Sequence, residues 1–385
     1  MGPVERSELA MYRNMILGEI EGKDRECLDH LKSIKSVVVD KNDYIFRMGE
    51  LHLLLGEHKE AKKVFTKSFK RGVTEDYRVH SGYMCAVLDM SRAECVAACK
   101  LRGMETVATQ MVLTAAQCDT LTAEYEDLLN RFPRSSAMKR ILLTTTTSKK
   151  FEELMDKYLR NGLRKGVPSL GADVTALFTV AATPNNVNLS PRNLCMGDGA
   201  FVVSKDPIEL CKHERYNTVT KLLDSYITCL EESSKLPLES TEEPPSTLLW
   251  CYYLRAHLLE LIGEICPALE AIEKCIDHTP TAVDIYEKKG RLMKLAGDVH
   301  QAADIIDSGR ALDKADRYIN NKTTKYMLRS GRPEEAENRI AMFTRHESNP
   351  TQNLFDMQCS WFELEFAKCM MAKGEIGKAL KKFGK

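Results

Sequence analysis

Small and apolar residues recur in the C-terminal part of the chain with a period of 34 residues. The glycines of this pattern are Gly263, Gly297 and Gly331. An alanine follows each glycine by five residues and an isoleucine by nine, and these residues are Ala268, Ala302, Ala336, Ile272, Ile306 and Ile340. The pattern predicts pairs of antiparallel helices, with glycine at the turn and alanine where the second helix crosses the first too closely for a larger side chain.

The same pattern returns near both ends of the sequence. On the N-terminal side the matching residues are Gly22, Gly56, Cys27, Ala61, Leu31 and Phe65. On the C-terminal side Gly374, Ala379 and Phe383 restore it after a gap of 43 residues, which places nine extra residues around 346–353. A period of 34 residues with these small positions is typical of tetratricopeptide repeats. We therefore predict an all-α solenoid of stacked helix pairs, whose function lies on an extended binding surface.

Four parts are predicted along this array. Residues 1–182 form N-terminal repeats that become degenerate after about residue 100. Residues 183–206 are rich in Asn, Pro, Gly and Ser, and we expect a loop or a disordered insertion there. Residues 207–246 form a helix followed by a linker rich in Pro and Glu. Asp206 and Pro207 are typical of the N-cap and the first turn of a helix, so we expect the helix to start there. Residues 247–385 form the C-terminal repeats, of which the last is truncated.

The composition argues against several classes of protein but does not identify the function. Lys and Arg number 55, as do Asp and Glu, so the chain lacks the overall positive field of a nucleic-acid binder. We find no apolar run of membrane-spanning length and no signal peptide in the first 17 residues, and we expect a cytoplasmic protein that does not enter membranes. The 13 cysteines include no Cys-x-x-Cys pair, so neither a disulfide framework nor a metal site is predicted.

The first helix of each pair is expected to line the concave side of the solenoid. In pairs that begin at Leu249, Val283 and Arg317, the residues at positions 2, 5, 9 and 12 would face a partner. These residues change from aromatic to mixed charge to basic along the array, and the candidates for a partner-binding groove are Trp250, Tyr253, Arg291, Tyr318 and Asn321. Trp250 fits the core of the array equally well, so both interpretations stay open.

Basic residues are concentrated between Asp313 and Arg345. Lys322, Lys325 and Arg329 stand at i, i+3 and i+7, which places them along one side of a helix. One interpretation is an ordinary solvated face. The other is an anion site, in which several cations converge on a phosphate-rich ligand or an acidic partner through charge-assisted hydrogen bonds.

Several stretches go beyond the general repeat pattern. The most specific are EPPSTLLW at 243–250, HTPT at 278–281, LDKADRYINNKTTKYML at 312–328 and MQCSW at 357–361, with weaker ones at 131–134, 150–160 and 165–166. Together they resemble the auxiliary, scaffolding subunit of the N-terminal acetyltransferase A complex. The resemblance covers most of the chain and is strongest from 243 to 382.

This resemblance implies a helical horseshoe that wraps and positions a catalytic N-terminal acetyltransferase subunit and anchors it to the ribosome. It also implies that inositol hexakisphosphate bridges the two subunits through basic residues, for which the matching candidates are Lys322, Lys325, Arg329 and Arg345. The chain itself would require no cofactor. Members of this family are much longer than 385 residues, and we therefore expect the printed chain to be a fragment or a truncated form.

Catalysis by this chain is not expected. Acetyltransferases of this superfamily hold acetyl-CoA with an Arg/Gln-x-x-Gly-x-Gly/Ala loop, and no Arg or Gln here has Gly three residues later. The alternative function is that of a tetratricopeptide co-chaperone or general interaction adaptor, but only Asn321 and Lys325 partly match the carboxylate clamp that such an adaptor uses. An RNA-processing scaffold would need a continuous basic stripe, which the balance of charges argues against.

Overall fold

The chain forms helices joined by short turns. The structure is a computed structural model that describes residues 2–101, 106–110, 113–146, 148–178, 213–344 and 350–384. All regular elements in these residues are helices, apart from an isolated β-bridge between Lys235 and Glu242. The prediction of an all-α fold built from helix pairs is confirmed. Among the same residues, no helix is both long and apolar enough to cross a membrane.

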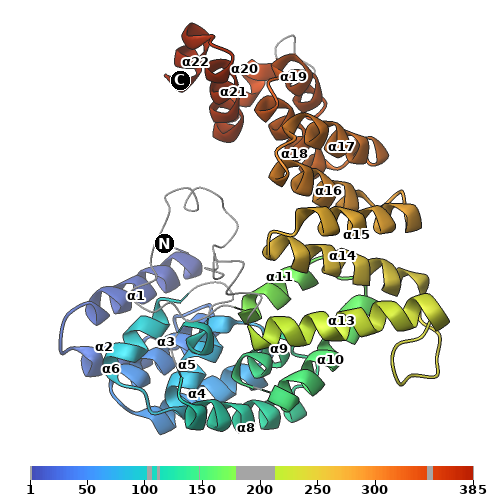
Figure 1. Cartoon of the computed structure of the whole chain (residues 1–385). Helices are drawn as coiled ribbons and strands as arrows, with labels where there is room; N and C mark the ends of the chain where they lie inside the picture. The colour runs from blue at the N-terminus through green and yellow to red at the C-terminus, as the bar shows by residue number, and fades with distance from the viewer. Residues whose placement is uncertain are drawn as a thin grey trace. The chain divides into compact units, whose positions relative to one another are not determined.

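The chain divides into two compact units, and each is considered by itself. The first unit comprises Met1–Tyr158 and Asp173–Lys205. Its helices are α1 (Pro3–Gly18), α2 (Asp24–Ser33), α3 (Lys41–Leu54), α4 (His58–Lys70), α5 (Tyr77–Val87), α6 (Arg92–Cys99), α7 (Val107–Gln110), α8 (Ala115–Arg131), α9 (Ser136–Thr145) and the 3-10 helix η1 (Ala176–Phe178) (Figure 1). Two further helices, α10 (Ser148–Arg164) and α11 (Leu170–Thr175), contribute residues to both units.

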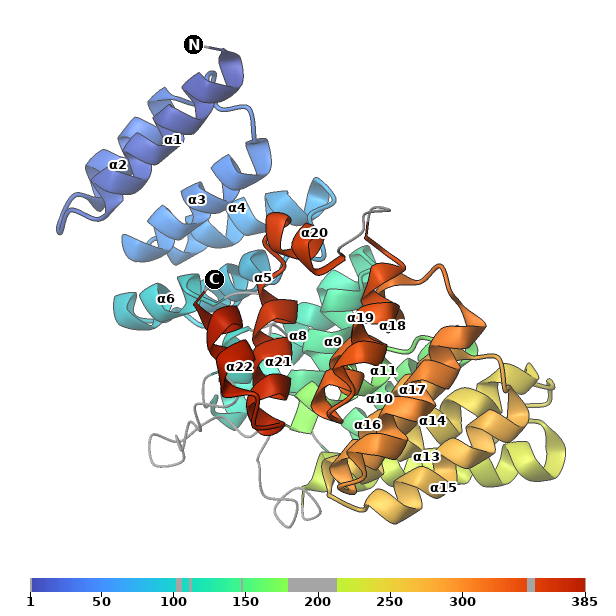
Figure 2. The ribbon, with the colours of Figure 1, turned by 90° about the horizontal axis from the view of Figure 1, so that it is seen from above.

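The second unit comprises Leu159–Ala172 and Asp206–Lys385. Its helices are α13 (Glu214–Ser233), α14 (Pro245–Leu261), α15 (Ile265–His278), α16 (Val283–Leu295), α17 (Val299–Leu312), α18 (Arg317–Arg329), α19 (Pro333–Ala341), α20 (Pro350–Asp356), α21 (Ser360–Ala372) and α22 (Ile376–Phe383) (Figure 2). The pairs α14–α15, α16–α17, α18–α19 and α21–α22 are the C-terminal repeats, with the additional helix α20 in front of the last pair.

Glycine ends the first helix of each pair. Gly297, just after α16, has a φ of 99°, a left-handed conformation that costs glycine little because it has no Cβ. Its equivalents in the other pairs, Gly22, Gly56, Gly263, Gly331 and Gly374, also have positive φ. The backbone N–H of Asp298 then donates to the carbonyl oxygen of Met293 at 3.1 Å, which completes the turn into α17. The regular spacing of the glycines is therefore the spacing of the turns that join the two helices of each pair.

The alanines lie where the two helices of a pair cross. Ala268, Ala302 and Ala336 are completely buried. At the crossing of α16 and α17, a Cβ added to Gly290 would lie 3.1 Å from the carbonyl oxygen of Ala302 and would overlap the side chain of Ile306. Neither helix has room for a larger side chain there, as the sequence predicts.

Some expectations concern residues that the structure does not describe. The proposed insertion at 183–206 and the predicted helix start at Asp206 and Pro207 lie outside the described residues. In the described part, α13 begins at Glu214, and the His213 imidazole accepts a hydrogen bond from the backbone N–H of Arg215. The predicted domain boundaries stay predictions.

The close crossing of α16 and α17 yields a test. Replacing Ala302 with Phe should lower the free energy of unfolding by about 1–3 kcal/mol, because the added ring has no space between the two helices. The matched control is Gln301→Phe, at the adjacent exposed position of the same helix. Urea unfolding followed by circular dichroism measures both changes. Equal stability of the two variants would contradict the predicted register of the helix pairs.

Candidate functional site

The predicted basic residues of α18 lie between two other first helices, α16 and α21. Lys322 Nζ is 3.3 Å from the Glu287 carboxylate of α16, and the Tyr318 hydroxyl donates to the same carboxylate at 2.9 Å. On the other side, Arg329 donates two hydrogen bonds of 2.9 Å to the Glu365 carboxylate of α21. Ion pairs thus connect first helices of successive pairs.

Lys325 lies at the centre of this arrangement. Its ammonium group is 5.4 Å from the ring centre of Trp361 in α21, a cation–π distance. A hollow of about 180 Å³ opens here, and it is lined by Tyr318, Asn321, Lys322, Lys325 and Trp361. We call these five residues, together with Lys294 and Arg329, the cation cluster. Among the residues that the structure describes, Lys322 and Arg329 form ion pairs with carboxylates, whereas no carboxylate lies within ion-pair distance of Lys325 or Lys294.

The pKa values show where positive charge is least compensated. Burial is the largest cause that lowers the pKa of Lys325, and the cations of Arg329, Lys322 and Lys368 lower it further, against the opposing effect of Glu365. Burial and the nearby Arg329 also lower the pKa of Lys294. An anion in the hollow would relieve this repulsion, so the arrangement favours binding of negative charge.

The other basic residues of the cluster are more fully neutralised. Burial works against the charged form of Lys322, but the Glu287 carboxylate and the Tyr318 hydroxyl outweigh it, so the pKa of Lys322 is raised. Hydrogen bonds to Glu365 raise the pKa of Arg329. A ligand would have to share these two cations with carboxylates that already hold them. Arg345, the fourth predicted candidate, lies outside the described residues.

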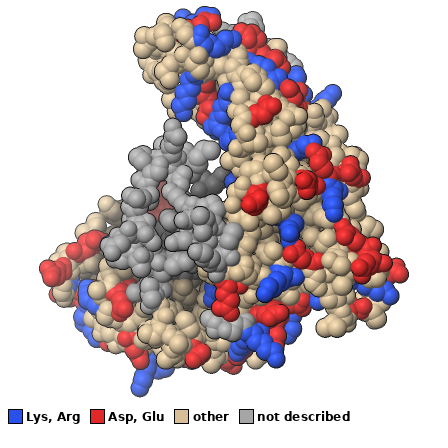
Figure 3. Space-filling model, in the orientation of Figure 1, with Lys and Arg blue, Asp and Glu red and all other residues tan. Residues whose placement is uncertain are grey.

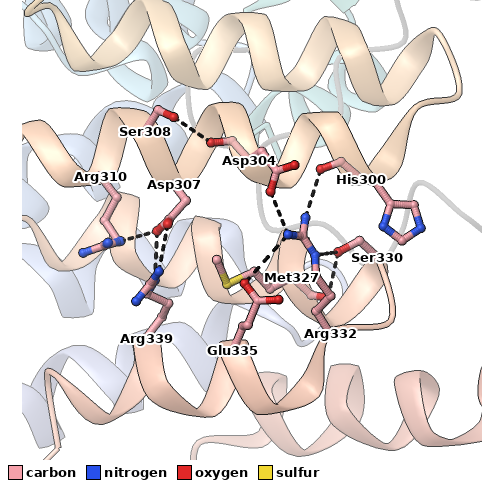
Figure 4. A network of polar contacts seen from close by, with 10 residues as sticks. All are labelled: His300, Asp304, Asp307, Ser308, Arg310, Met327, Ser330, Arg332, Glu335 and Arg339. Carbon is pink, nitrogen blue, oxygen red and sulfur yellow. Dashed lines mark hydrogen bonds and ion pairs between the residues drawn. The ribbon is translucent and has the colours of Figure 1, made fainter.

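A second group of cations from the same basic stretch is used to join second helices, and Figure 4 shows its contacts. Arg339 of α19 donates two hydrogen bonds of 2.9 Å to Asp307 of α17. Arg332 donates to Asp304 at 2.7 Å and to the carbonyl oxygen of His300 at 3.0 Å. These arginines hold α17 and α19 together and are not part of the cation cluster.

The aromatic candidates lie in a different environment. A Cβ added to Gly166 would overlap the indole nitrogen of Trp250, and one added to Gly171 would lie 2.9 Å from the ring of His257. Residues 159–172 of the chain itself therefore cover this part of α14, within the same compact unit. Tyr253 packs against Trp250 with ring centres 5.5 Å apart. This observation supports the core interpretation of Trp250.

Buried charges lie next to these aromatic residues. Lys288 of α16 forms an ion pair with Glu260 of α14, and both side chains are almost completely buried. Lys288 Nζ is also 3.0 Å from Nδ1 of His257. Burial and the Lys288 charge hold the pKa of His257 at about 3, so this imidazole is neutral at physiological pH. Arg291, another groove candidate, pairs with Oε1 of Glu260, while Lys288 pairs with Oε2. Its role in partner binding stays a prediction.

Two residues of the site were missed in the sequence. Trp361 stands 13 residues before Gly374, as Trp250 stands 13 before Gly263 and Tyr318 stands 13 before Gly331. Counting back from Gly374 would have placed Trp361 at position 2 of its pair. The gap of 43 residues hid this equivalence, and with it Glu365 on the next turn of α21.

One face of the C-terminal repeats carries charges of both signs. Figure 3 shows Lys and Arg side chains interspersed with Asp and Glu over this part of the molecule. Local sites, rather than a broad field, must therefore provide any electrostatic recognition. The fold is that of an α-helical repeat protein.

Comparison with known proteins identifies the family. The sequence model of the family "N-terminal acetyltransferase A, auxiliary subunit" matches residues 4–188 and 209–385. The chain belongs to this family. It is 30% identical over 380 residues to the N-terminal acetyltransferase A complex auxiliary subunit NAA15 of Arabidopsis thaliana, covering 99% of this chain and 37% of that protein.

Two further relatives agree. The human N-alpha-acetyltransferase 16, NatA auxiliary subunit, is 30% identical over 383 residues, covering 98% of this chain and 37% of that protein. A solved structure of Naa15/Naa10 bound to HypK-THB superposes with a TM-score of 0.76 at 25% identity, over 99% of this chain and 48% of the matched chain. The chain thus spans about a third to a half of the proteins it matches.

The contact between Gly166 and Trp250 yields a second test. Gly166→Ala should lower the free energy of unfolding by about 1 kcal/mol or more, because alanine is disfavoured at a φ of 60° and its Cβ would displace the indole. Gly331→Ala is the control, since Gly331 has a φ of 76° but no neighbour within 4 Å of an added Cβ. Urea unfolding and tryptophan fluorescence measure both. An indole emission that stays unchanged in Gly166→Ala would contradict the contact.

Proposed function

We propose that this chain is part of a non-catalytic scaffold, which binds a catalytic N-terminal acetyltransferase subunit and positions it for co-translational acetylation of protein N-termini. The observation that carries the proposal is the family match over nearly the whole chain. The similarity to Naa15 in a complex with Naa10 supports it. We further propose that the protein acts in the cytoplasm and, through the longer scaffold, at the ribosome.

The physical properties of the second unit suit this role. Tight crossings within pairs and ion pairs between pairs keep the first helices rigid, so their exposed side chains are held in place before a partner arrives. Such preorganisation reduces the entropy lost on binding. Tyr318 and Asn321, which line the hollow on α18, belong to the proposed contact surface.

The proposal extends to an anion at the cation cluster. Lys325 and Lys294 provide the least compensated positive charge, and Lys322 and Arg329 stand beside them. Inositol hexakisphosphate carries several phosphates at short separations and could contact cations of α16 and α18 together. Bound there, it would reduce the repulsion among these side chains and offer further negative charge to a basic surface of the catalytic subunit.

A solvated basic face is the competing interpretation. Glu287 already forms an ion pair with Lys322, and Glu365 forms one with Arg329. These ion pairs weaken the case for an anion at the two basic residues. The case rests instead on Lys325, which lines the hollow beside Lys322 with its ammonium group over the ring of Trp361. Lys325 is therefore the position at which the two interpretations differ most.

Inositol hexakisphosphate should stabilise the chain through Lys325. At a hundredfold excess over its Kd, the ligand is expected to add about 2.7 kcal/mol to the free energy of unfolding, and salt should weaken the effect. Lys325→Glu should lose most of this gain. Lys314→Glu, a charge reversal in the exposed turn before α18, should keep it. Thermal unfolding with and without ligand measures the shift, and an unchanged shift in Lys325→Glu would favour the solvated face.

Activity should depend on the catalytic partner. The purified chain alone is expected to transfer no acetyl group from acetyl-CoA to N-terminal peptides, since no acetyl-CoA loop of the expected type occurs in its sequence. Adding the catalytic subunit should give activity whose peptide preference differs from that of the subunit alone, because a scaffold shifts the partner toward one conformation. Turnover by partner-free chain would contradict the proposed division of roles.

A further inference from the structure

Two carboxylates stand among the basic residues of the cation cluster. Glu287 of α16 lies 3.3 Å from Lys322 Nζ, and Glu365 of α21 accepts two hydrogen bonds of 2.9 Å from Arg329. An anion bound in the hollow would be repelled by both acids. The two acids therefore work against the anion that the surrounding cations favour.

The acids compensate half of the positive charge of the cluster. Its four cations are Lys294, Lys322, Lys325 and Arg329, and two carboxylates among them leave a net charge of +2. The side chain of Glu365 is 12% exposed, against 28% for that of Glu287. Water therefore screens the charge of Glu365 less, and this acid should have the larger effect on a bound anion.

Glu365 acts on basic residues beyond its direct partner. Burial lowers the pKa of Lys325, and the charge of Glu365 opposes this effect. Burial and neighbouring cations also lower the pKa of Lys294, and Glu365 again opposes them. Burial raises the pKa of Glu365 itself, but the hydrogen bonds and charge of Arg329 outweigh burial, so this pKa is lowered and the carboxylate is ionised at neutral pH. Glu365 thus compensates several cations, as a bound anion would.

Ion pairs between neighbouring helices can also serve only to join them. Arg339 and Asp307 join α19 to α17 in that way. Glu287 differs in the position of its partner, because Lys322 lines the hollow beside Lys325. An anion in the hollow therefore competes with Glu287 for Lys322.

We propose that Glu287 and Glu365 act as built-in competitors of the anion and set a charge threshold for the ligand of the cation cluster. A ligand must displace a carboxylate to reach Lys322 or Arg329, so an anion with one or two phosphates gains little over the existing ion pairs. A ligand with several closely spaced phosphates replaces both carboxylates and also compensates Lys325, which forms no ion pair in the described ranges. The inference rests on the anion site of the proposed function and assigns to it a densely phosphorylated small molecule.

Isothermal titration calorimetry with the full chain tests the sign of this effect. Glu287→Gln and Glu365→Gln keep the size of the side chain and remove its charge, so each should bind inositol hexakisphosphate about tenfold more tightly than the wild type. Glu365→Asp, which keeps the charge, should bind it like the wild type. The matched control is Glu270→Gln, which removes an exposed acid of α15 outside the cluster and should leave the affinity unchanged. Circular dichroism checks the fold of each variant.

Inorganic pyrophosphate tests the threshold itself. The wild type should show no measurable binding of pyrophosphate. The double variant Glu287→Gln/Glu365→Gln should bind it, because no carboxylate then has to be displaced, and salt should weaken this binding. Equal binding of pyrophosphate by the wild type and the double variant would overturn the threshold.

The outcomes separate this inference from the anion site on which it rests. If the wild type binds inositol hexakisphosphate and the glutamine variants bind it equally or more weakly, the two acids only join helices, and the inference is overturned while the anion site stands. If neither the wild type nor any variant binds inositol hexakisphosphate, the anion site itself fails, and the inference fails with it.

Discussion

The close crossing of the two helices in each pair is the constraint on which the C-terminal repeats depend. Ala302 on α17 faces Gly290 on α16, and there is no space for another carbon between them. The left-handed turn at Gly297 brings the chain back at the angle that this crossing requires. Because each pair repeats the same crossing, successive pairs stack, and their first helices present side chains from neighbouring turns of the array.

The cation cluster is a consequence of this stacking. Lys322 reaches back to Glu287 in the preceding pair, while Arg329 reaches forward to Glu365 in the following pair. Lys325 lies between these two ion pairs, with its ammonium group over the ring of Trp361. Residues from α18 and α21, between Tyr318 and Trp361, thus line one hollow. Arg332, just before α19, and Arg339, on α19, instead join α19 to α17.

The regularly spaced residues predicted the fold well, because their period marks each turn with a glycine and each helix crossing with an alanine. α16 and α18 begin at Val283 and Arg317, as predicted, whereas α14 begins at Pro245, four residues before the predicted Leu249. Lys322, Lys325 and Arg329 do share one side of α18. Irregular features escaped prediction for physical reasons. The contact of Gly166 with Trp250 joins segments with no common period, and the longer connection before α21 concealed Trp361.

We propose that the first helices of the C-terminal repeats hold a catalytic N-terminal acetyltransferase subunit. Hydrogen exchange followed by mass spectrometry tests it most directly, with the full chain measured alone and after addition of that subunit. We expect slower exchange in the complex for amides of α16, α18 and α21, with little change in α17 and α19. Failure of the two proteins to form a complex, or protection confined to the second helices, would contradict it.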